Sequence, residues 1–309
     1  MMTTCWVVSP MLHDTESFVR LRADVAAACT QRSETIRHLV IDDSAGTDTD
    51  VARLSEFEDV EVLTPAFNLG HQRAIVFGLR ELAPRLAPDD LVVTMDSDGE
   101  DQPADVPRLL GALDDGPVAL ALAERTTRSE GLRFRVMYLV FRAAFRILTG
   151  TTVKSGNFAA QRADSLKATI HHPSFDLCYS STLLELKRAT TLVPCARGSR
   201  YAGKSRMNTY SLMAHGVRML LPMAERIAVR LMIVSALSGV ALLIGLLGGA
   251  IGLLDGIDAD VRLALLGTNA VVFAASFTAF VVLFSSFARP TGHKINIYYS
   301  VKLSKMCKA

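Results

Sequence analysis

The stretch Leu91-Val92-Val93-Thr94-Met95-Asp96-Ser97-Asp98-Gly99-Glu100-Asp101 decides the fold of this chain. Its short apolar run, Leu91 to Val93, is typical of a buried strand. Ligands bind beyond the carboxyl ends of strands in an open α/β sheet, so Asp96 and Asp98 are expected where a ligand would lie. Two carboxylates one residue apart suit Mg²⁺, which is often held by one or two carboxylates plus substrate phosphates. An acidic loop that caps the next helix explains the same residues equally well, and the stretch alone leaves both interpretations open.

Strand and helix patterns alternate on both sides of this stretch. Strands are predicted at residues 5–10, 36–41, 60–63, 118–122 and 191–193, and helices at 14–28, 51–57, 68–79 and 106–113. This alternation predicts an α/β fold with a mostly parallel sheet and helices on both faces. A second strand also ends in acids, Asp42 and Asp43, which should open onto the same edge as Asp96 and Asp98. Two acidic strand ends at the ligand-binding edge favour function over solvation.

The composition bounds the class of protein. The 309 residues hold one large domain or two smaller ones, and half of them are hydrophobic. The net charge of +2 indicates no particular partner, and we expect no nucleic-acid binding. Five scattered cysteines show no metal-binding spacing and are interpreted as reduced packing residues. The first ten residues have no basic region and no long apolar core, so they do not resemble a signal peptide.

An aromatic stripe lies at helical spacing within residues 126–149. It consists of Phe134, Tyr138, Phe141, Phe145 and Leu148. Arginines flank it at Arg133, Arg135, Arg142 and Arg146. Two interpretations compete, a core helix with a solvated basic rim and an amphipathic helix at about 131–149 lying in a membrane interface with its aromatic side chains inserted. We favour the interfacial helix because the C-terminal third of the chain is strongly apolar.

Two long apolar runs dominate that third. Leu231 to Leu254 and Leu263 to Ala288 contain no charged residue, and each exceeds the roughly 20 residues that span a bilayer as a helix. The connecting residues 255–262 are acidic, whereas basic residues flank the pair at Arg226, Arg230, Arg289, Lys294, Lys302, Lys305 and Lys308. The positive-inside rule therefore puts both flanks, and both termini, in the cytoplasm. We predict a catalytic domain at 1–206, a juxtamembrane amphipathic helix at 207–226, a transmembrane hairpin at 227–289 and a basic tail at 290–309.

A basic loop precedes the juxtamembrane helix. Residues 200–206 carry Arg200, Lys204 and Arg206, with Gly203 and Ser205 between them. Small residues let backbone amides approach a phosphate, and Arg binds phosphate through two parallel hydrogen bonds. Arg125 and Arg128 are further candidates for the same anion.

Six motifs in order resemble those of the family 2 glycosyltransferases with a GT-A fold. They are Val7 to Pro10 with Asp14 and Glu16, Asp42-Asp43-Ser44, Asn68-Leu69-Gly70, Asp96-Ser97-Asp98, Gly156-Asn157-Phe158 with Arg162, and Arg200 to Arg206. Together with the paired apolar helices, they are similar to the polyprenyl-phosphate branch, which includes dolichyl-phosphate mannose synthase and bacterial undecaprenyl-phosphate glycosyltransferases. Asn157 stands where that branch usually has Asp, and Lys204 and Arg206 replace its Glu and Lys.

The resemblance implies a role for each matched residue. The residues implied to bind the donor are Pro10, Asp14, Glu16, Asp42, Asp43, Asn68, Gly70 and Asp96. Asp98, with Asp96, is implied to bind a divalent metal, Mg²⁺ or Mn²⁺. The acceptor phosphate falls to Arg125, Arg128, Asn157, Arg162, Arg200, Ser205 and Arg206. The catalytic set is Asp98, Asp96, Arg200 and Arg206.

The expected reaction moves a sugar from a UDP- or GDP-sugar to a polyprenyl phosphate at the plasma (inner) membrane, with inversion of the anomeric centre. The acceptor phosphate is already an anion at neutral pH, so an Asn at position 157 does not prevent the reaction. Two alternatives stay open, a transferase of the same family that uses another acceptor such as a growing glycan, and a non-catalytic scaffold with the same fold. The sequence leaves a homo-oligomer open.

Overall fold

A computed structural model describes residues 3–114, 116–125, 132–186, 188–203, 209–254, 256–287 and 300–302. The chain forms two compact units. The first, called the sheet domain here, comprises residues 1–142, 152–222 and 296–309, and the second, the helical unit, comprises 143–151 and 223–295.

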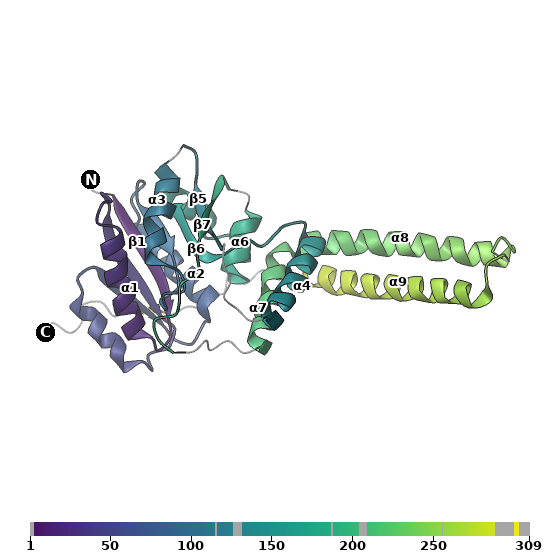
Figure 1. The fold of residues 1–309 in the computed structure, drawn as a ribbon, viewed down its shortest axis with the longest axis horizontal. Helices are drawn as coiled ribbons and strands as arrows, with labels where there is room; N and C mark the ends of the chain where they lie inside the picture. The colour runs from purple at the N-terminus through teal and green to yellow at the C-terminus, as the bar shows by residue number, and fades with distance from the viewer. Residues whose placement is uncertain are drawn as a thin grey trace. The chain divides into compact units, whose positions relative to one another are not determined.

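The described strands of the sheet domain form one sheet in the order β7-β5-β6-β4-β1-β2-β3-β8 (Figure 1). Their bounds are β1 (Thr4–Met11), β2 (Thr35–Asp42), β3 (Val60–Pro65), β4 (Leu91–Thr94), β5 (Leu120–Arg125), β6 (Ser155–Arg162), β7 (Thr190–Cys195) and β8 (Ser300–Lys302). β1 pairs in parallel with β2 and β4, and β2 with β3, so these strands end at one edge. β6 runs antiparallel between β4 and β5, β5 pairs in parallel with β7, and β8 is antiparallel to β3.

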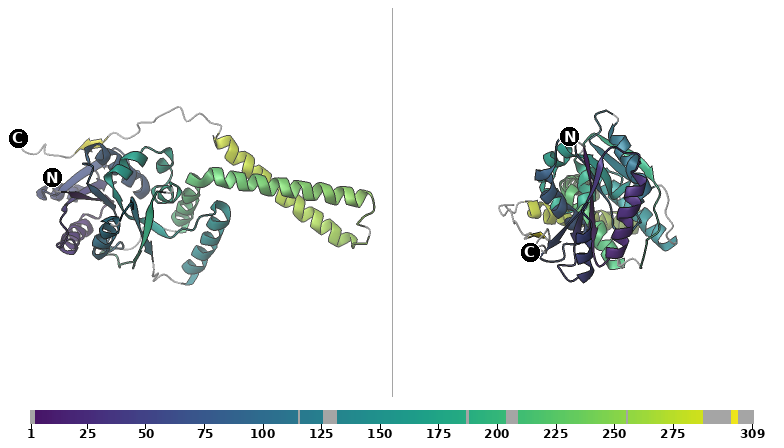
Figure 2. Two further views of the ribbon diagram at one scale, coloured as in Figure 1. Left: turned by 90° about the horizontal axis from the view of Figure 1, so that it is seen from above. Right: turned by 90° about the vertical axis from the view of Figure 1, so that its left-hand side faces the viewer.

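Helices cover both faces of the sheet (Figure 2). Their bounds are α1 (Thr15–Ala28), α2 (His71–Leu82), α3 (Val106–Asp114), α5 (Ala163–Thr169) and α6 (Tyr179–Glu185), with 3₁₀ turns at η1 (Thr49–Glu56), η2 (Ala83–Arg85), η3 (Pro103–Asp105) and η4 (Pro173–Asp176). The same domain also contains α7 (Thr209–Leu220). Side chains of α1 and α3 pack with Val7 and Val93 on one face, and side chains of α2, α5 and α6 with Val8 and Val92 on the other. Alternate side chains of one strand enter different cores, which explains the continuous apolar runs of β1 and β4.

The predicted α/β class and GT-A arrangement are confirmed, with local differences. Of the α-helix expected at 51–57, residues 51–56 belong to the 3₁₀ turn η1, and β5 begins at Leu120, two residues later than expected. The sequence analysis did not predict β6, α5 or α6. For β6, the reason is that Ser155–Arg162 has no apolar alternation, and its pairing with β4 and β5 decides its conformation. Part of the predicted basic tail, Ser300–Lys302, is the edge strand β8.

The helix expected at about 131–149 is present as α4 (Leu132–Thr149), but the face that we assigned to a membrane is wrong. Phe145 is buried, and the Phe141 ring lies against Gly216 of α7, 3.1 Å from where a Cβ would be. Among the side chains of α4 that the structure describes, which exclude Phe134, the large apolar ones that are exposed are Leu139, Val140 and Ile147. Periodicity located the stripe correctly, but it does not say which of the two faces packs on protein.

The helical unit contains a pair of long antiparallel helices, α8 (Ala224–Ala250) and α9 (Ala259–Phe287), joined to the preceding chain by the 3₁₀ turn η5 (Leu221–Met223) (Figures 1 and 2). They contact closely at glycines, with Gly239 against Phe273 and Gly245 against Leu266, and the Asn269 Nδ2 donates to the Ser238 carbonyl at 3.0 Å. By length and composition, Tyr210–Ala250 and Ala259–Ser285 are long and apolar enough to cross a membrane, and most of their side chains are not buried by protein.

Candidate active site

A cleft of about 1750 Å³ lies in the sheet domain, where β1, β2 and β4 end. The predicted residues that line it are Pro10, Asp14, Asp43, Asn68, Gly70, Asp96, Asp98, Arg125, Asn157 and Arg200. The two acid-ended strands therefore open onto the same edge, as the sequence predicts. Segments separated by more than one hundred residues meet here because the parallel strands of an α/β sheet deliver their following loops to one edge.

Three carboxylates gather after β4. Asp96 and Asp98 line the cleft, and the Asp101 Oδ2 accepts a hydrogen bond from the Asp96 backbone N–H at 3.1 Å. Burial, with the nearby charge of Asp96, raises the pKa of Asp98 from 3.8 to about 6. The same causes raise the pKa of the fully buried Asp101 to about 7. Such a concentration of poorly solvated negative charge attracts a cation.

One cation is supplied by the loop of residues 196–203. The Arg200 guanidinium lies 2.7 Å from the Asp98 Oδ2 and 3.8 Å from Glu100, while Arg197 pairs with Glu100. Backbone hydrogen bonds join the loop to the acidic turn, from Gly198 N–H to the Glu100 carbonyl at 2.8 Å and from Tyr201 N–H to the Asp98 carbonyl at 2.8 Å. Arg200 is thus placed beside the predicted metal carboxylate.

Tyr201 attaches this loop to α1 and to the acidic turn. Its hydroxyl donates to Asp24 at 2.7 Å, and the Arg20 guanidinium lies 4.3 Å from the centre of its ring. A Cβ at Gly99 would lie 2.7 Å from that ring, and Gly99 has a φ of +85°. Only glycine combines this close contact with the left-handed conformation, which explains the glycine after Asp98.

The other acidic strand end organises the start of α2. The Asp43 carboxylate accepts hydrogen bonds from the Leu69 and Gly70 backbone N–H groups at 2.6 and 2.8 Å, and Asn68 donates to the Asp43 carbonyl at 2.8 Å. Burial raises the pKa of Asp43, and these two N–H groups oppose the rise. Asp43 therefore fixes the turn that places the first residues of α2 in the cleft.

Asn157 connects β6 to the acidic turn. Its Nδ2 donates to the Asp96 Oδ1 at 3.3 Å, and its Oδ1 accepts from the Gln72 side chain. An aspartate here would add a fourth carboxylate beside Asp96, Asp98 and Asp101. The neutral amide instead provides a donor to Asp96 without additional repulsion.

Apolar side chains form a further part of the cleft wall. They come from α4 and α7 and include Met137, Tyr138, Phe141, Leu212, Met213, Val217 and Leu220. The acidic turn and this apolar wall belong to one cleft within the sheet domain. It can therefore accommodate a ligand that carries a charged group on a hydrocarbon chain.

Two predicted donor residues lie outside the cleft. Asp42 is buried, does not line the cleft, and accepts hydrogen bonds from Ser44 N–H and Thr64 Oγ1 at 3.0 and 3.3 Å. Glu16 is exposed on the first turn of α1 and does not line the cleft. We therefore no longer assign donor contacts to either residue.

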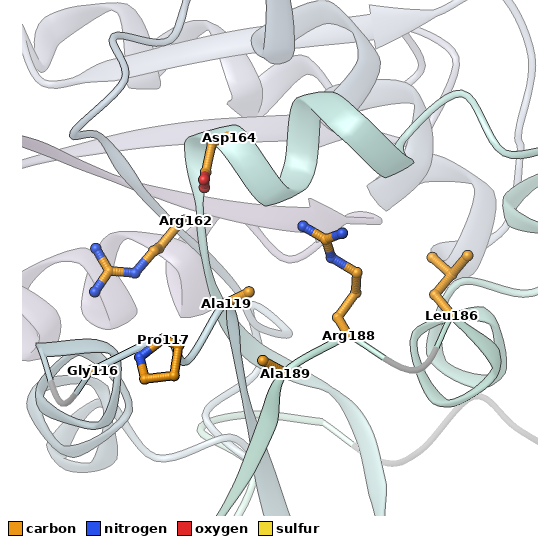
Figure 3. Close-up of a pocket in the computed structure, with 8 residues that line it drawn as sticks. All are labelled: Gly116, Pro117, Ala119, Arg162, Asp164, Leu186, Arg188 and Ala189. Atoms are coloured by element: carbon orange, nitrogen blue, oxygen red, sulfur yellow. The ribbon is translucent and has the colours of Figure 1, made fainter.

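The prediction for Arg162 is wrong. It ends β6 opposite Leu91, where β4 begins, and is therefore at the sheet edge away from Asp96 and Asp98. Its guanidinium donates to the Val118 and Leu113 carbonyls and lines a separate depression with Asp164 and Arg188 (Figure 3). Antiparallel β6 carries Asn157 to one edge and Arg162 to the other, which sequence proximity did not reveal. Arg128, Ser205, Arg206 and Lys204 lie outside the described residues.

Sequence reasoning missed four residues that bear on the site. Asp101 belongs to the acidic stretch after β4, and His71 and Gln72 come directly after the Asn68-Leu69-Gly70 motif, so their place at the site was available from the sequence. His215 lies on α7, 144 positions beyond His71, yet the two rings are 5.4 Å apart. No local signal could have paired them.

The residues of the site can hold a metal ion if a bound phosphate compound supplies further oxygen ligands. Among the described residues, no three His, Cys, Asp or Glu side chains form a metal-binding group. Asp96 and Asp98 supply carboxylate oxygens, and Mg²⁺ commonly takes one or two carboxylates and completes its coordination with phosphates and water. The site therefore suits a cation that arrives with a phosphate-bearing ligand.

The chain belongs to glycosyl transferase family 2, whose family model matches residues 17–177, more than half of the sequence. Curated relatives include undecaprenyl-phosphate 4-deoxy-4-formamido-L-arabinose transferases. The Edwardsiella ictaluri protein is 25% identical over 214 residues, 67% of this chain and 63% of its own, and the Enterobacter protein is 27% identical over 176 residues, 53% and 50% respectively. The chain spans about half to two thirds of the length of these relatives.

Solved structures with a similar fold include glucosyl-3-phosphoglycerate synthase from Mycobacterium tuberculosis in complex with Mn²⁺, uridine diphosphate and phosphoglyceric acid. It is 19% identical, with a TM-score of 0.49, covering 73% of this chain and 78% of that one. Mannosyl-3-phosphoglycerate synthase from Rubrobacter xylanophilus is 14% identical, with a TM-score of 0.47, covering 72% and 74%.

Proposed function

We propose that this protein is a membrane-bound, metal-dependent glycosyltransferase that moves a sugar from a nucleotide-diphosphate sugar to a polyprenyl phosphate, with inversion. The observation that carries the proposal is the composition of one cleft. It joins an acidic turn with a paired arginine to an apolar wall built by α4 and α7. The names of the curated relatives, which are undecaprenyl-phosphate transferases, support the same acceptor.

The donor diphosphate belongs beside the acidic turn. Asp98 and Asp96 would hold a divalent cation, Mg²⁺ or Mn²⁺, together with the donor phosphates, and that cation would supply charge neutralisation for the leaving diphosphate. Asn157 holds the Asp96 carboxylate in place through its 3.3 Å hydrogen bond. Pro10, Asp14 and Asn68 line the cleft and are proposed to contact the nucleoside, whether uridine or guanosine.

The position of Arg200 bears on its role. The sequence assigns Arg200 to the catalytic set and to the acceptor phosphate, and its 2.7 Å contact with Asp98 supports a position near the donor phosphates as well. The Arg200 guanidinium would donate to phosphate oxygens and neutralise charge that develops in the transition state. Arg125, 3.7 Å from Asp101, also lines the cleft and is proposed to meet the acceptor.

The chemical step needs no general base. An oxygen of the acceptor phosphate attacks the anomeric carbon, the bond from that carbon to the donor phosphate oxygen breaks, and the nucleoside diphosphate departs with the electron pair. A single displacement of this kind inverts the anomeric centre. Because the attacking oxygen is already anionic, the neutral Asn157 is compatible with the reaction.

The hairpin is proposed to span the plasma membrane twice, with the sheet domain and both flanks in the cytoplasm. The basic flanks and the acidic connection at 255–262 support this orientation. The exposed apolar side chains of α7, Tyr210, Met213 and Val217, suit contact with lipid close to the cleft that α7 borders.

The test is a transfer assay with the purified full-length protein. It combines Mg²⁺ or Mn²⁺ and a panel of UDP- and GDP-sugars with either undecaprenyl phosphate or undecaprenol, followed by extraction and mass measurement of the lipid. We expect glycosylated lipid only with the phosphorylated acceptor. Transfer to another acceptor but not to the lipid phosphate would favour a glycan-extending enzyme, and no transfer with any donor would favour a scaffold.

A further inference from the structure

Four polar side chains, two amides and two imidazoles, form one wall of the cleft, next to Asp96. They are His71 and Gln72 at the start of α2, Asn157 on β6 and His215 on α7, and we call them the amide–imidazole cluster. The two imidazole rings lie 5.4 Å apart with an angle of 45° between them. Of these four side chains, the role proposed for the acidic turn uses Asn157, through its hydrogen bond to Asp96.

Gln72 is the buried centre of the cluster. Its Nε2 donates to the His71 Nε2 at 3.1 Å and to the Asn157 Oδ1, and its Oε1 accepts from the Ser180 backbone N–H at 3.0 Å. Both donors and the acceptor of the amide are therefore used, which fixes its orientation. The fixed amide holds the His71 ring in place at the wall of the cleft.

The cluster differs in charge from the opposite part of the site. Arg200 and Arg197 pair on the side of Asp98 and Glu100, whereas Asp96 receives the uncharged Asn157 amide. A wall of amides and imidazoles offers directional donors and acceptors with little charge, which matches hydroxyl groups better than phosphate.

We propose that the amide–imidazole cluster is the subsite for the transferred sugar, with His71 and His215 contacting its hydroxyl groups and Gln72 positioning His71 and Asn157. The inference rests on the proposed function, and deepens it by naming the residues that select the sugar. Asp96 connects the two subsites, because a sugar linked to a diphosphate at the acidic turn must lie within a few bonds of it. His215 also places part of the sugar subsite on α7, the same helix that lines the apolar part of the cleft.

The experiment measures binding rather than turnover. Dissociation constants of UDP, GDP, UDP-glucose, UDP-galactose and GDP-mannose are determined by calorimetry with Mg²⁺ for the full-length protein in detergent. The nucleotide sugar that the wild type binds best is chosen for the comparison. For each variant, the key quantity is the dissociation constant of this nucleotide sugar divided by the dissociation constant of its nucleotide alone. We expect His71→Ala and His215→Ala to raise this ratio about three- to tenfold, the effect of one or two lost hydrogen bonds, with the nucleotide constant within about twofold.

Substitutions of known chemistry separate the alternatives. Gln72→Glu keeps the acceptor for Ser180 but removes both side-chain donors, so it should raise the ratio as His71→Ala does, and a melting curve shows whether it folds. His71→Asn should restore part of the binding, whereas His71→Lys should not. His171→Ala, at an exposed histidine outside the cleft, is the matched control and should change nothing.

Three outcomes would overturn the assignment. Equal weakening of nucleotide and nucleotide sugar would assign the cluster to the diphosphate. Tighter, salt-dependent binding by His71→Lys would assign it to a phosphate. Unchanged ratios in both histidine variants would exclude a sugar contact. If the wild type bound no nucleotide at all, the proposed function would be wrong, and the assignment of a sugar subsite would be wrong as well.

Discussion

Replacement of Gly99 by alanine tests whether Tyr201 holds the arginine loop against the acidic turn. The new Cβ would lie 2.7 Å from the Tyr201 ring, in a residue whose φ is +85°. The left-handed conformation alone costs a non-glycine residue about 1–2 kcal/mol. Relief of the clash requires the ring to move away from Gly99, which puts two contacts of Tyr201 at risk.

The size of the second effect follows from those contacts. The hydrogen bond from Tyr201 to Asp24 is 2.7 Å long, and a partly exposed bond of this kind is worth about 1 kcal/mol. The Arg20 guanidinium over the ring adds about 0.5–1 kcal/mol at an exposed site. We therefore expect Gly99→Ala to lower the free energy of unfolding of the sheet domain by about 2.5–4 kcal/mol.

Gly46→Ala is the matched control. Gly46 has a similar φ of +80°, but a Cβ there would meet no atom within 4 Å, so only the backbone strain of about 1–2 kcal/mol applies. The assay is denaturant unfolding in detergent, combined with the KM for the nucleotide sugar. Gly99→Ala alone should raise that KM, because Tyr201 N–H also binds the Asp98 carbonyl. Equal destabilisation by the two substitutions, with equal KM values, would refute the idea that Tyr201 fixes the loop.

The remaining predictions concern the metal, the orientation in the membrane and a buried histidine. Asp98→Asn should leave the melting temperature nearly unchanged and abolish transfer, with Asp96→Asn almost as severe; near-normal turnover in EDTA-treated, Mg²⁺-replenished Asp98→Asn would contradict the metal assignment. In a protein that lacks Cys307, a cysteine introduced at Ala259 should react with an impermeant thiol reagent in intact cells. A cysteine introduced at the exposed Glu56 should react only after permeabilisation. The reverse pattern would exclude a cytoplasmic sheet domain. Burial lowers the pKa of His38 from 6.5 to about 4, so its contribution to stability is complete above pH 6.5 and is lost as the pH falls through about 4. His38→Phe should reduce this acid sensitivity of unfolding relative to wild type, and an unchanged pH profile would show that His38 is not its source.

The parallel half of the fold was predictable because its strands carry their own signals. Leu91–Thr94 and Thr35–Asp42 are apolar runs that end in acids, and burial on both faces of the sheet requires such runs. β6 carries no such signal, since its conformation depends on pairing with two partners distant in the chain. The direction of β6 also explains why Asn157 lies at the cleft as predicted and Arg162 does not, because the strand carries the two residues to opposite edges of the sheet.

The candidate site was predictable where motif and strand end coincide, as at Asp43, Asn68, Asp96 and Asp98. It was not predictable where function depends on a contact between distant helices. Two such contacts involve α7: His215 lies against His71, and Gly216 packs against Phe141. The sequence of α7 indicates only that it is an amphipathic segment. An amphipathic pattern specifies that one face is covered, and it leaves open which element covers it.

The pairing of β8 with β3 has a consequence for how the chain can be threaded. β8 comes after α9 in the sequence, yet it hydrogen-bonds to the same sheet whose other strands precede α8. A sheet cannot form across a bilayer, so the chain that leaves the sheet domain must return to the side from which it left. The number of crossings between Leu220 and Ser300 must therefore be even. In the proposed topology, α8 and α9 each span the membrane once. Deleting α9 while retaining α8 would then make that number odd and leave the final strand in the wrong compartment, unable to complete the edge of its own sheet.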